Sequence, residues 1–278
     1  MEIEIRKDSD ALKWVLIIIC FVFLGIFLLL PLGYIVATAL RDGINAYTSA
    51  ITDEYAIKAV LLTLEATIWA VSINTIFGIA AAWCLTKFAF KGKKILSTFI
   101  DLPVTVSPII AGLIYVLTFG RQGALYSYLD SYGVQIIFAV PGIVLATIFV
   151  TFPFISRELI PVLTAQGTDE EEAAALMGAG TFTIFRKVTL PHIKWALLYG
   201  VVLCTARAMG EFGAVSVLSG HLRGKTNTLP LYIELLYQGY DFTGAFATSS
   251  ILVIMAIVVL ILRLALERKG KKHLDITK

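Results

Sequence analysis

Apolar residues come in long, continuous runs along this chain. Six runs can be marked, near residues 14–40, 59–86, 96–119, 136–156, 193–219 and 245–266. A helix needs about 20 mostly apolar residues to cross a bilayer, and a backbone in lipid must satisfy its own hydrogen bonds. Because the runs do not alternate polar with apolar positions, they do not fit the strands of a β-barrel. The pattern predicts an all-α, polytopic membrane protein with six transmembrane helices.

The composition supports a membrane protein and excludes several other classes. Of 278 residues, 58% are hydrophobic and 15% are charged, whereas a typical soluble domain has about 25% charged residues. The 17 residues from Trp14 to Leu30 carry no polar side chain, which is too long for the apolar core of a signal peptide, about 7–15 residues. We therefore expect a retained anchor. The net charge of +3 gives no reason to expect nucleic acid as a partner.

The basic residues predict which side of the membrane each loop faces. Sixteen lysines and arginines fall in the N-terminal stretch, the second and fourth loops and the tail, against five in the other loops. Basic residues favour the cytoplasmic side, so both termini are expected in the cytoplasm. The three cysteines and three histidines are spread along the chain and match no metal or disulfide spacing, so no metal and no cofactor are expected.

The fourth loop contains a predicted helix and a hinge. Thr168 and Glu171 have the spacing of a capping box, the acidic run from Asp169 favours the positive end of a helix, and Ala173 to Met177 are strong helix formers. We expect a helix of about three turns, roughly 13 Å long, broken at Gly178 or Gly180. A second short helix would follow, joined stiffly by Pro191 to the fifth span. Such an arrangement is a lever: a push on the loop would tilt that span.

This loop resembles the EAA loop of ABC-importer permeases. The resemblance rests on Glu172-Ala173-Ala174, then Gly178 after three residues, then Val188, Leu190 and Pro191; the family prefers Ile where this chain has Val188. It implies an ABC type-1 permease fold, a loop at 166–191 that docks on a separate ATPase subunit, and six contact or hinge positions: Glu172, Ala173, Ala174, Gly178, Leu190 and Pro191. It also divides the chain into residues 1–56 with the first anchor helix, a transmembrane type-1 domain at 57–266, and a basic tail at 267–278.

The third and fifth spans carry residues that can bend a membrane helix or place charge inside it. Arg207 and Glu211 lie four residues apart in the fifth span and can pair along one helix face. Charges inside a membrane usually face a bundle interior or a water-filled path, so the pair is either part of a path or gate or a structural ion pair. Pro103 and Pro108 should kink the third span, either for packing alone or to shape a path. The residues assigned to the path or gate are Arg207, Gly210, Glu211, Gly213 and Ser216.

The loop after the fifth span is basic. His221, Arg223 and Lys225 stand at its outer mouth, where a positive potential could concentrate an anion; an ordinary solvated turn is the equal alternative. The stretch from Ala206 to Tyr237 resembles the sulfate/thiosulfate permeases of the CysW type, although Gly210-Glu-Phe-Gly-Ala214 is shared with molybdate permeases. The resemblance implies import of sulfate or thiosulfate, a second, related permease subunit, an ATPase subunit dimer, an extracytoplasmic sulfate-binding protein, and the cytoplasmic (inner) membrane of a prokaryote. A molybdate or tungstate permease is the alternative within the family.

Two other classes of membrane protein fit less well. An ion-driven secondary transporter often shows internal symmetry with broken helices in matching positions, and no such symmetry is apparent. A membrane-embedded hydrolase would need a nucleophile beside a base or a metal motif, which the sequence does not show. It also has no Gly-x-x-x-x-Gly-Lys-Ser/Thr P-loop. We therefore expect a transport subunit that is not itself an enzyme.

Overall fold

The computed structural model describes residues 10–276, and every regular element in that range is a helix. The chain begins with α1 (Asp10–Leu24), η1 (Gly25–Leu29), α2 (Leu30–Ala39), α3 (Ile44–Ile51), α4 (Glu54–Lys87), α5 (Lys93–Thr105), α6 (Pro108–Phe119), α7 (Tyr126–Ser131) and α8 (Val140–Thr151). It continues with α9 (Pro153–Gln166), α10 (Asp169–Leu176), α11 (Thr181–Ile184), η2 (Phe185–Thr189), α12 (Leu190–Met209), α13 (Gly213–Ser219), α14 (Leu229–Gln238) and α15 (Phe242–Ile276). The all-α fold class predicted from the apolar runs is confirmed.

The predicted membrane spans are present with shifted limits. Within residues 10–276, five helical stretches are long and apolar enough to cross a membrane: Leu12–Ala39, Glu54–Lys87, Val140–Gln166, Thr181–Met209 and Phe242–Arg268. The pair α5 and α6 makes a sixth only if it is counted as one span. The fourth span was predicted to begin at residue 136. It begins at Val140 because Phe138 has a φ of 59°, which no helix continues, and Pro141 suits a first turn.

The third span is broken rather than kinked. Helices α5 and α6 meet at an angle of 107°. Pro103 lies inside α5, which continues to Thr105, so the break is caused by Pro108, which begins α6. A proline disfavours helical geometry in the residue before it, and two residues separate the end of α5 at Thr105 from Pro108. The disturbance predicted from the two prolines is thus present, but it divides the predicted span 96–119 into two helices and is more than a kink.

The fifth span also differs from the prediction at both ends. Its helix begins at Thr181, because α11, the π-helical turn η2 and α12 follow one another without a gap. The second short helix of the predicted lever is thus not separate but is the first part of the span itself. At the other end, α12 stops at Met209, and α13 starts at Gly213. The predicted continuous helix over 193–219 is interrupted at residues 210–212.

The core of the bundle lies where α4 meets α8, α9 and α12. Helix α4 buries a stripe of small residues, and α9 buries Ile155, Leu159 and Leu163 against it and α12. A Cβ atom at Gly78 would lie 2.7 Å from Ile155 Cγ2, so the two helices touch only because that position is glycine. Close contact of this kind holds helices together in lipid, where apolar surface alone gives no driving force.

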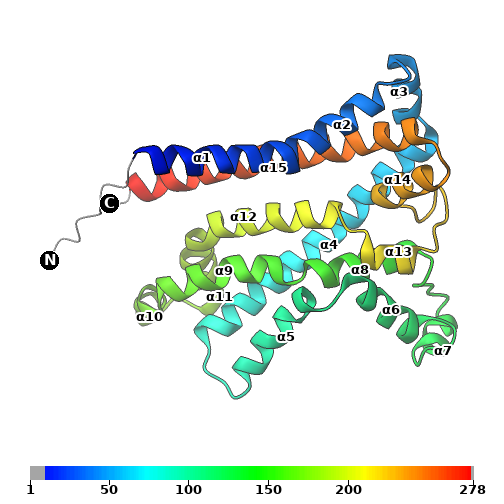
Figure 1. The fold of residues 1–278 in the computed structure, drawn as a ribbon. Coiled ribbons are helices and arrows are strands. Elements are labelled where there is room, and N and C mark those ends of the chain that lie inside the picture. Colours follow the sequence, from blue (N-terminus) through cyan, green and yellow to red (C-terminus); the bar gives the residue numbers. More distant parts are fainter. Residues whose placement is uncertain (1–9, 277–278) are drawn as a thin grey trace.

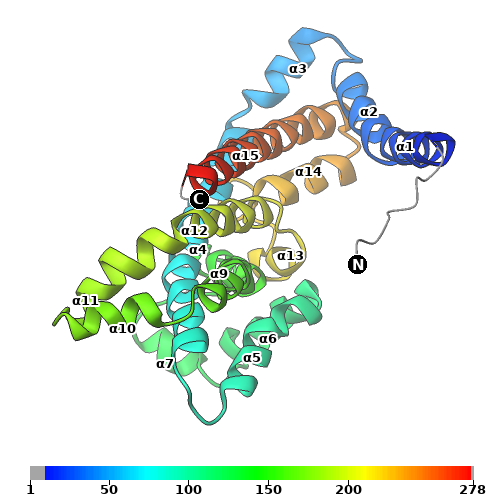
Figure 2. The ribbon, with the colours of Figure 1, turned by 90° about the vertical axis from the view of Figure 1, so that its left-hand side faces the viewer.

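The first span stands apart from this bundle. Helix α2 packs against α15, but the best apolar stretch of the first span has none of its residues buried. Figure 2 shows α1 leading away from α4, α9 and α12. In Figure 1 the beginning of α1 and the end of α15 lie at the same end of the molecule as α10, and α3, α7 and α14 lie at the opposite end. We call the end that holds α10 the elbow end, after the bent segment of α10 and α11 described below, and the other the opposite end.

Candidate functional site

The predicted hinge is a well-formed helix stop. The amide of Gly178 donates to Ala175 O, and the amide of Ala179 donates to Ala174 O, which is the hydrogen-bond pattern of a Schellman motif. Gly178 has a φ of 85°, a region that residues with a Cβ atom adopt at a cost. Helix α10 is eight residues long, about 12 Å, and so is slightly shorter than expected. We call α10, this turn and α11 (residues 169–184) the elbow.

The predicted capping box is absent. The side chain of Thr168 makes no capping hydrogen bond to α10. Glu171, the other half of the proposed box, points instead toward Lys87 at 3.1 Å and accepts a 2.7 Å hydrogen bond from the Thr189 hydroxyl. These long-range partners are stronger than a local cap, because one is an ion pair with little exposure to water. The acidic first turn of α10 still suits the positive helix end.

Several residues of the elbow face outward. Leu176, Met177 and Phe182 are 90%, 83% and 74% exposed. Such exposure is unusual for large apolar residues outside lipid. Glu172 and Ala173 are exposed as well, whereas Ala174 is buried. Leu190 is half-buried and Pro191 is exposed at the start of α12. The predicted docking residues therefore form an outward surface, except Ala174, which packs inward, and Leu190, which is partly covered.

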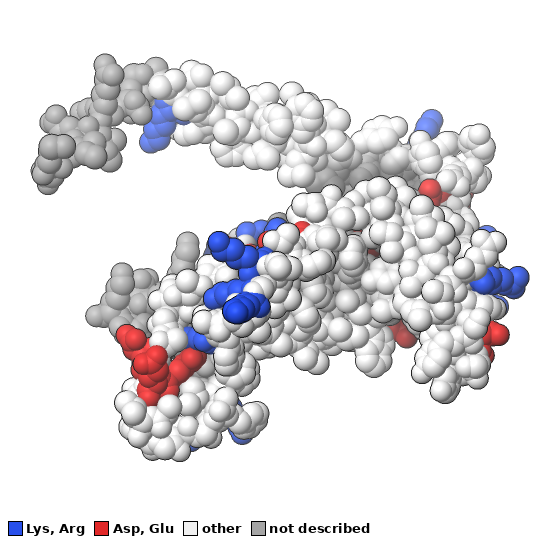
Figure 3. All heavy atoms as spheres, turned by 90° about the horizontal axis from the view of Figure 1, so that it is seen from below, with Lys and Arg blue, Asp and Glu red and all other residues white. Residues whose placement is uncertain are grey.

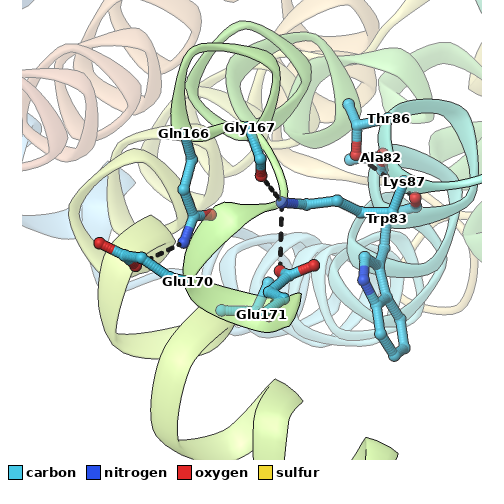
Figure 4. A network of polar contacts seen from close by, with 9 residues as sticks. Ala82, Trp83, Thr86, Lys87, Gln166, Gly167, Glu170 and Glu171 are labelled. Atoms are coloured by element: carbon cyan, nitrogen blue, oxygen red, sulfur yellow. Dashed lines mark hydrogen bonds and ion pairs between the residues drawn. The ribbon is translucent and has the colours of Figure 1, made fainter. Parts of the chain in front are cut away.

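The elbow is held to the bundle by a polar network that the sequence analysis did not identify (Figure 4). Lys87, the last residue of α4, donates to the Gly167 carbonyl and pairs with Glu171. Gln166 bonds Glu170 at 3.2 Å on the other side of the turn. Lys87 follows an apolar run like any other flanking lysine, so no local pattern marks it. Only the folding of α4 beside α10 brings it to Glu171.

The acidic residues of the elbow gather at one end of the molecule. Asp169, Glu170, Glu171 and Glu172 occupy the first turn of α10. In Figure 3 a cluster of acidic side chains lies at the elbow end, and a group of basic side chains lies beside it on the bundle. The outward surface of the elbow thus combines exposed apolar residues with an acidic rim. Such a surface suits a protein partner better than anionic lipid headgroups, which favour basic helices.

Arg207 and Glu211 do form an ion pair, but across a break instead of along a helix. Arg207 Nη1 lies 2.7 Å from Glu211 Oε2, and the Glu211 side chain is 1% exposed while that of Arg207 is 33% exposed. The other carboxylate oxygen accepts from the Ala214 amide at 2.9 Å. Glu211 therefore joins the end of α12 to the start of α13. This pairing, predicted from the spacing, is confirmed, while the helix that was expected to carry it ends at Met209.

The other predicted path residues lie around the same break. Gly210 is exposed at the end of α12, and the Ser216 hydroxyl donates to Gly213 O. A Cβ atom at Gly213 would lie 3.0 Å from Pro108 Cβ. The broken third span and the broken fifth span therefore meet, with α13 packed on α6. The structure brings together two interruptions that lie about 100 residues apart in the sequence.

The outer mouth contains both signs of charge. His221, Arg223 and Lys225 are exposed on the connection between α13 and α14, but Arg223 lies over the Tyr55 ring at 4.3 Å. A cavity of about 300 Å³ beside it is lined by Arg223 and by Asp42, Asp53 and Asp241. These aspartates come from other segments, so the loop sequence alone could not show that they balance its charge.

Asp53 ties the opposite end of α4 to α14. Its carboxylate accepts from the amides of Tyr55 and Ala56 at the start of α4 and from the Tyr232 hydroxyl at 2.9 Å. Burial, and then this hydrogen bond, raise the pKa of Tyr232 above its ordinary value. The phenol therefore stays a neutral donor at neutral pH. This contact fixes the tyrosine on which part of the Arg223 side chain rests.

Within residues 10–276 no group of three or more His, Cys, Asp or Glu side chains is placed to hold a metal ion. The candidate site thus consists of the exposed elbow, the polar network around Lys87 and Glu171 behind it, and the ion pair between Arg207 and Glu211 at the end of α12.

Comparison with known proteins identifies the family. Residues 74–272 match the family described as "Binding-protein-dependent transport system inner membrane component". The chain is 48% identical over 255 residues to the sulfate transport system permease protein CysW of Escherichia coli (strain K12), covering 92% of this chain and 88% of that protein. It is 44% identical over 261 residues to the protein of the same name from a Synechocystis strain, covering 94% and 95%.

A solved structure shares the fold. The bacterial alginate ABC transporter, crystallised with an alginate pentasaccharide-bound periplasmic protein, has a chain with a TM-score of 0.77 and 19% identity, covering 95% of both chains. The predicted ABC type-1 permease fold is thereby confirmed. This chain belongs to the family of binding-protein-dependent transport system inner membrane components.

Proposed function

We propose that this chain is a permease subunit of an ATP-driven importer that carries sulfate, and with it thiosulfate, across the cytoplasmic membrane of a prokaryote. The observation that carries the proposal is the 48% identity to a sulfate permease over 92% of this chain. Such similarity includes the whole stretch from the elbow to the outer mouth. The geometry adds a route for mechanical force from one end of the molecule to the other.

The route begins at the elbow. Its second arm, α11, is continuous with α12 as one helical stretch, Thr181–Met209, of 29 residues, about 43 Å at 1.5 Å per residue. A displacement of the outward surface around Gly178 therefore acts on one end of a rigid rod. The other end of that rod carries Arg207, whose partner Glu211 lies in the break before α13. Closure of a partner at the elbow would bias the bundle between two conformations.

The partners follow from the same arrangement. The elbow, with its exposed apolar residues and acidic rim, would dock on a dimer of ATPase subunits, which would also hydrolyse the ATP; this chain would serve as a transport component. Residues 57–266 would form the transmembrane type-1 domain, between the segment 1–56 and the basic tail 267–278. The exposed first span fits assembly with a second, related permease subunit. An extracytoplasmic sulfate-binding protein would deliver the anion at the opposite end.

The path need not select the anion strongly. Arg207 is partly exposed and positive, and its charge is balanced by a carboxylate that is almost fully buried. A balanced pair tolerates an anion without trapping it, because a bound sulfate would compete with Glu211 for the guanidinium. Selection would then lie in the binding protein.

The test is uptake by the reconstituted complex. Proteoliposomes that contain this chain with its ATPase, second permease and binding protein should accumulate labelled sulfate only when ATP is inside. Excess thiosulfate should compete, and molybdate should not. Competition by molybdate or tungstate at concentrations near that of sulfate would assign the transporter to those anions. Uptake driven by a proton gradient without ATP would contradict the proposal in favour of a secondary transporter.

A further inference from the structure

The first observation is that two opposite charges are buried together behind the elbow. Lys87 Nζ lies 3.1 Å from Glu171 Oε1, with 6% and 14% of the two side chains exposed. Exposed surface ion pairs contribute little, but a pair this protected from water is costly to separate, because either ion alone would keep its desolvation cost without its partner. Lys87 also donates to the carbonyl of Gly167, the residue directly after the end of α9. The lysine thus holds the connection between α9 and α10.

The same carboxylate also reaches the fifth span. Glu171 Oε1 accepts a hydrogen bond from Thr189 Oγ1 at 2.7 Å, and Thr189 is fully buried. Thr189 is the last residue of η2, directly before α12. A π-helical turn holds one more residue than an α-helical turn and so changes the direction of the side chains that follow it. One carboxylate oxygen therefore joins α10 to the end of α4 and to the base of α12.

A second contact links α4 to η2, the π-helical turn that follows the elbow. Trp83, one turn before Lys87, lies with its ring 5.0 Å from that of Phe185 in η2. The end of α4 thus contacts α10 through Lys87 (Figure 4) and the base of the fifth span through Trp83. Helix α4 is also the helix that packs on α8, α9 and α12 in the core. Movement of the elbow together with η2 relative to α4 would have to break both contacts.

Neighbouring glutamates on α10 face in different directions. Glu171 is turned inward to Lys87 and Thr189, while Glu172 is exposed on the outward surface. One carboxylate is therefore free for a partner and the next is used within the chain. This difference allows docking and force transfer to be separated by mutation.

We propose that Lys87 and Glu171 form a latch that fastens the elbow to α4 as well as to α12, so that ATPase-driven displacement of α10 moves both helices as one body. Both are positioning residues, and the inference rests on the proposed function. Without the latch, α10 would pivot on Gly178, and its ATPase-driven displacement would not be passed on to α4 and α12. ATP would then be hydrolysed with less transport, while docking, which uses the outward surface, would be unchanged.

The experiment uses the complete complex in proteoliposomes and compares Lys87→Met with Lys91→Met. Lys91 is exposed in the same loop, so its substitution removes an equal charge without touching the latch. Three quantities are measured: ATP hydrolysed per sulfate imported, affinity of the permease pair for the ATPase subunits, and amide hydrogen exchange across residues 169–177. Glu172→Gln serves as the contrast, because it should weaken ATPase affinity.

The latch predicts that Lys87→Met raises the ATP-to-sulfate ratio and the exchange rate in 169–177 by about tenfold, since loss of one partner frees the segment to open locally. ATPase affinity should stay within about twofold of wild type. Lys91→Met should match wild type in all three. Lys87→Arg, which keeps the charge, should recover most of the coupling.

If Lys87→Met assembles poorly, the double variant Lys87→Met/Glu171→Gln leaves no buried ion unpaired and should show the same rise in both quantities. A wild-type ratio and wild-type exchange in the assembled variant would overturn the latch, as would a loss of ATPase affinity that accounts for the whole effect. If the wild-type complex fails to import sulfate, the proposed function is wrong. Hydrogen exchange in 169–177 would still show whether the pair holds the elbow.

Discussion

The carboxylate of Glu211 is the most deeply buried charge described here, and two groups compensate it. Arg207 supplies an opposite charge at 2.7 Å, and the Ala214 amide supplies a hydrogen bond at the start of α13. Each replaces part of the hydration that the carboxylate loses on burial. The four-residue spacing correctly indicated that the two side chains would meet. It did so for a local reason, since residues four apart stay close even where a helix has just ended.

Replacing Arg207 tests this pair. Arg207→Ala leaves Glu211 without its cation, and we expect sulfate uptake to fall by at least about tenfold, consistent with the cost of an unpaired buried charge. Lys225→Ala removes an exposed charge and should leave uptake within about twofold of wild type. The measurement is initial uptake of labelled sulfate, normalised to the amount of assembled complex. Equal, mild effects in both variants would show that uptake does not require Arg207.

Gly178 allows a graded test of the hinge. Its φ of 85° is accessible to glycine, costs roughly 1–2 kcal/mol for alanine and is closed to proline, whose φ is fixed near −65°. We therefore expect uptake to decrease in the order Gly178, Gly178→Ala, Gly178→Pro. ATPase activity should persist, and the subunit should remain in the membrane. Normal uptake by a well-expressed Gly178→Pro variant would contradict the assignment of this residue as the hinge.

At the scale of elements, two interrupted spans define the centre of the molecule. Helix α6 begins at Pro108, α13 begins at Gly213, and the two helices pack on each other. The sequence signalled the first interruption through its prolines but gave less sign of the second, because Gly210 to Phe212 contain no proline. Backbone groups freed at such breaks need partners within the protein. Glu211 provides one of them by binding the Ala214 amide.

The contact between α6 and α13 depends on glycine. A Cβ atom at Gly112 would lie 2.7 Å from the Ala214 carbonyl oxygen, so Gly112→Val should force the helices apart at a cost of about 1–3 kcal/mol. Gly33 in the first span has open space around it, and Gly33→Val is the matched control. Thermal unfolding in detergent should show a lower midpoint for Gly112→Val alone. Equal midpoints would show that α6 and α13 are not closely packed in solution.

The elbow shows what local patterns can and cannot predict. The run of helix formers and the glycine correctly placed α10 and its stop, because helix propensity and the Schellman turn are properties of neighbouring residues. The capping box was wrong because Lys87 and Thr189, 84 and 18 residues from Glu171 in the sequence, compete for the same carboxylate. The continuity of α11 with α12 was not predicted, because a proline inside a helix usually breaks it; here the π-helical turn Phe185–Thr189 directly precedes Pro191.

At the scale of the whole molecule, the arrangement of the ends is consistent with the charge distribution. The elbow, the start of α1 and the end of α15 lie at one end (Figure 1), and most lysines and arginines of the chain fall in the segments predicted to be cytoplasmic. Hydropathy predicted six spans, since burial in lipid is decided by composition over about 20 residues; within residues 10–276 five of them contain a long apolar helix, and the third is broken. Hydropathy could not predict which spans pack together, because an apolar run does not specify its partner helix.

The orientation can be measured by cysteine labelling. In a background without Cys20, Cys84 and Cys204, a cysteine at position 91 should react with a membrane-impermeant maleimide only in inverted vesicles. A cysteine at position 225 should react only in intact cells. This follows if basic residues mark the cytoplasmic side. Labelling of both positions from the same side would show that the topology is wrong.

Contact between the elbow and a nucleotide-hydrolysing partner is the central step of the proposed mechanism. We would replace Glu172 with cysteine in the assembled complex and cross-link it to single cysteines placed around the cleft of the ATPase subunit. We expect efficient cross-links, with yields that change between the ATP-bound and nucleotide-free states. A cysteine at position 172 that reacts only with reagents outside the cell, or never cross-links to the ATPase, would contradict the proposed mechanism.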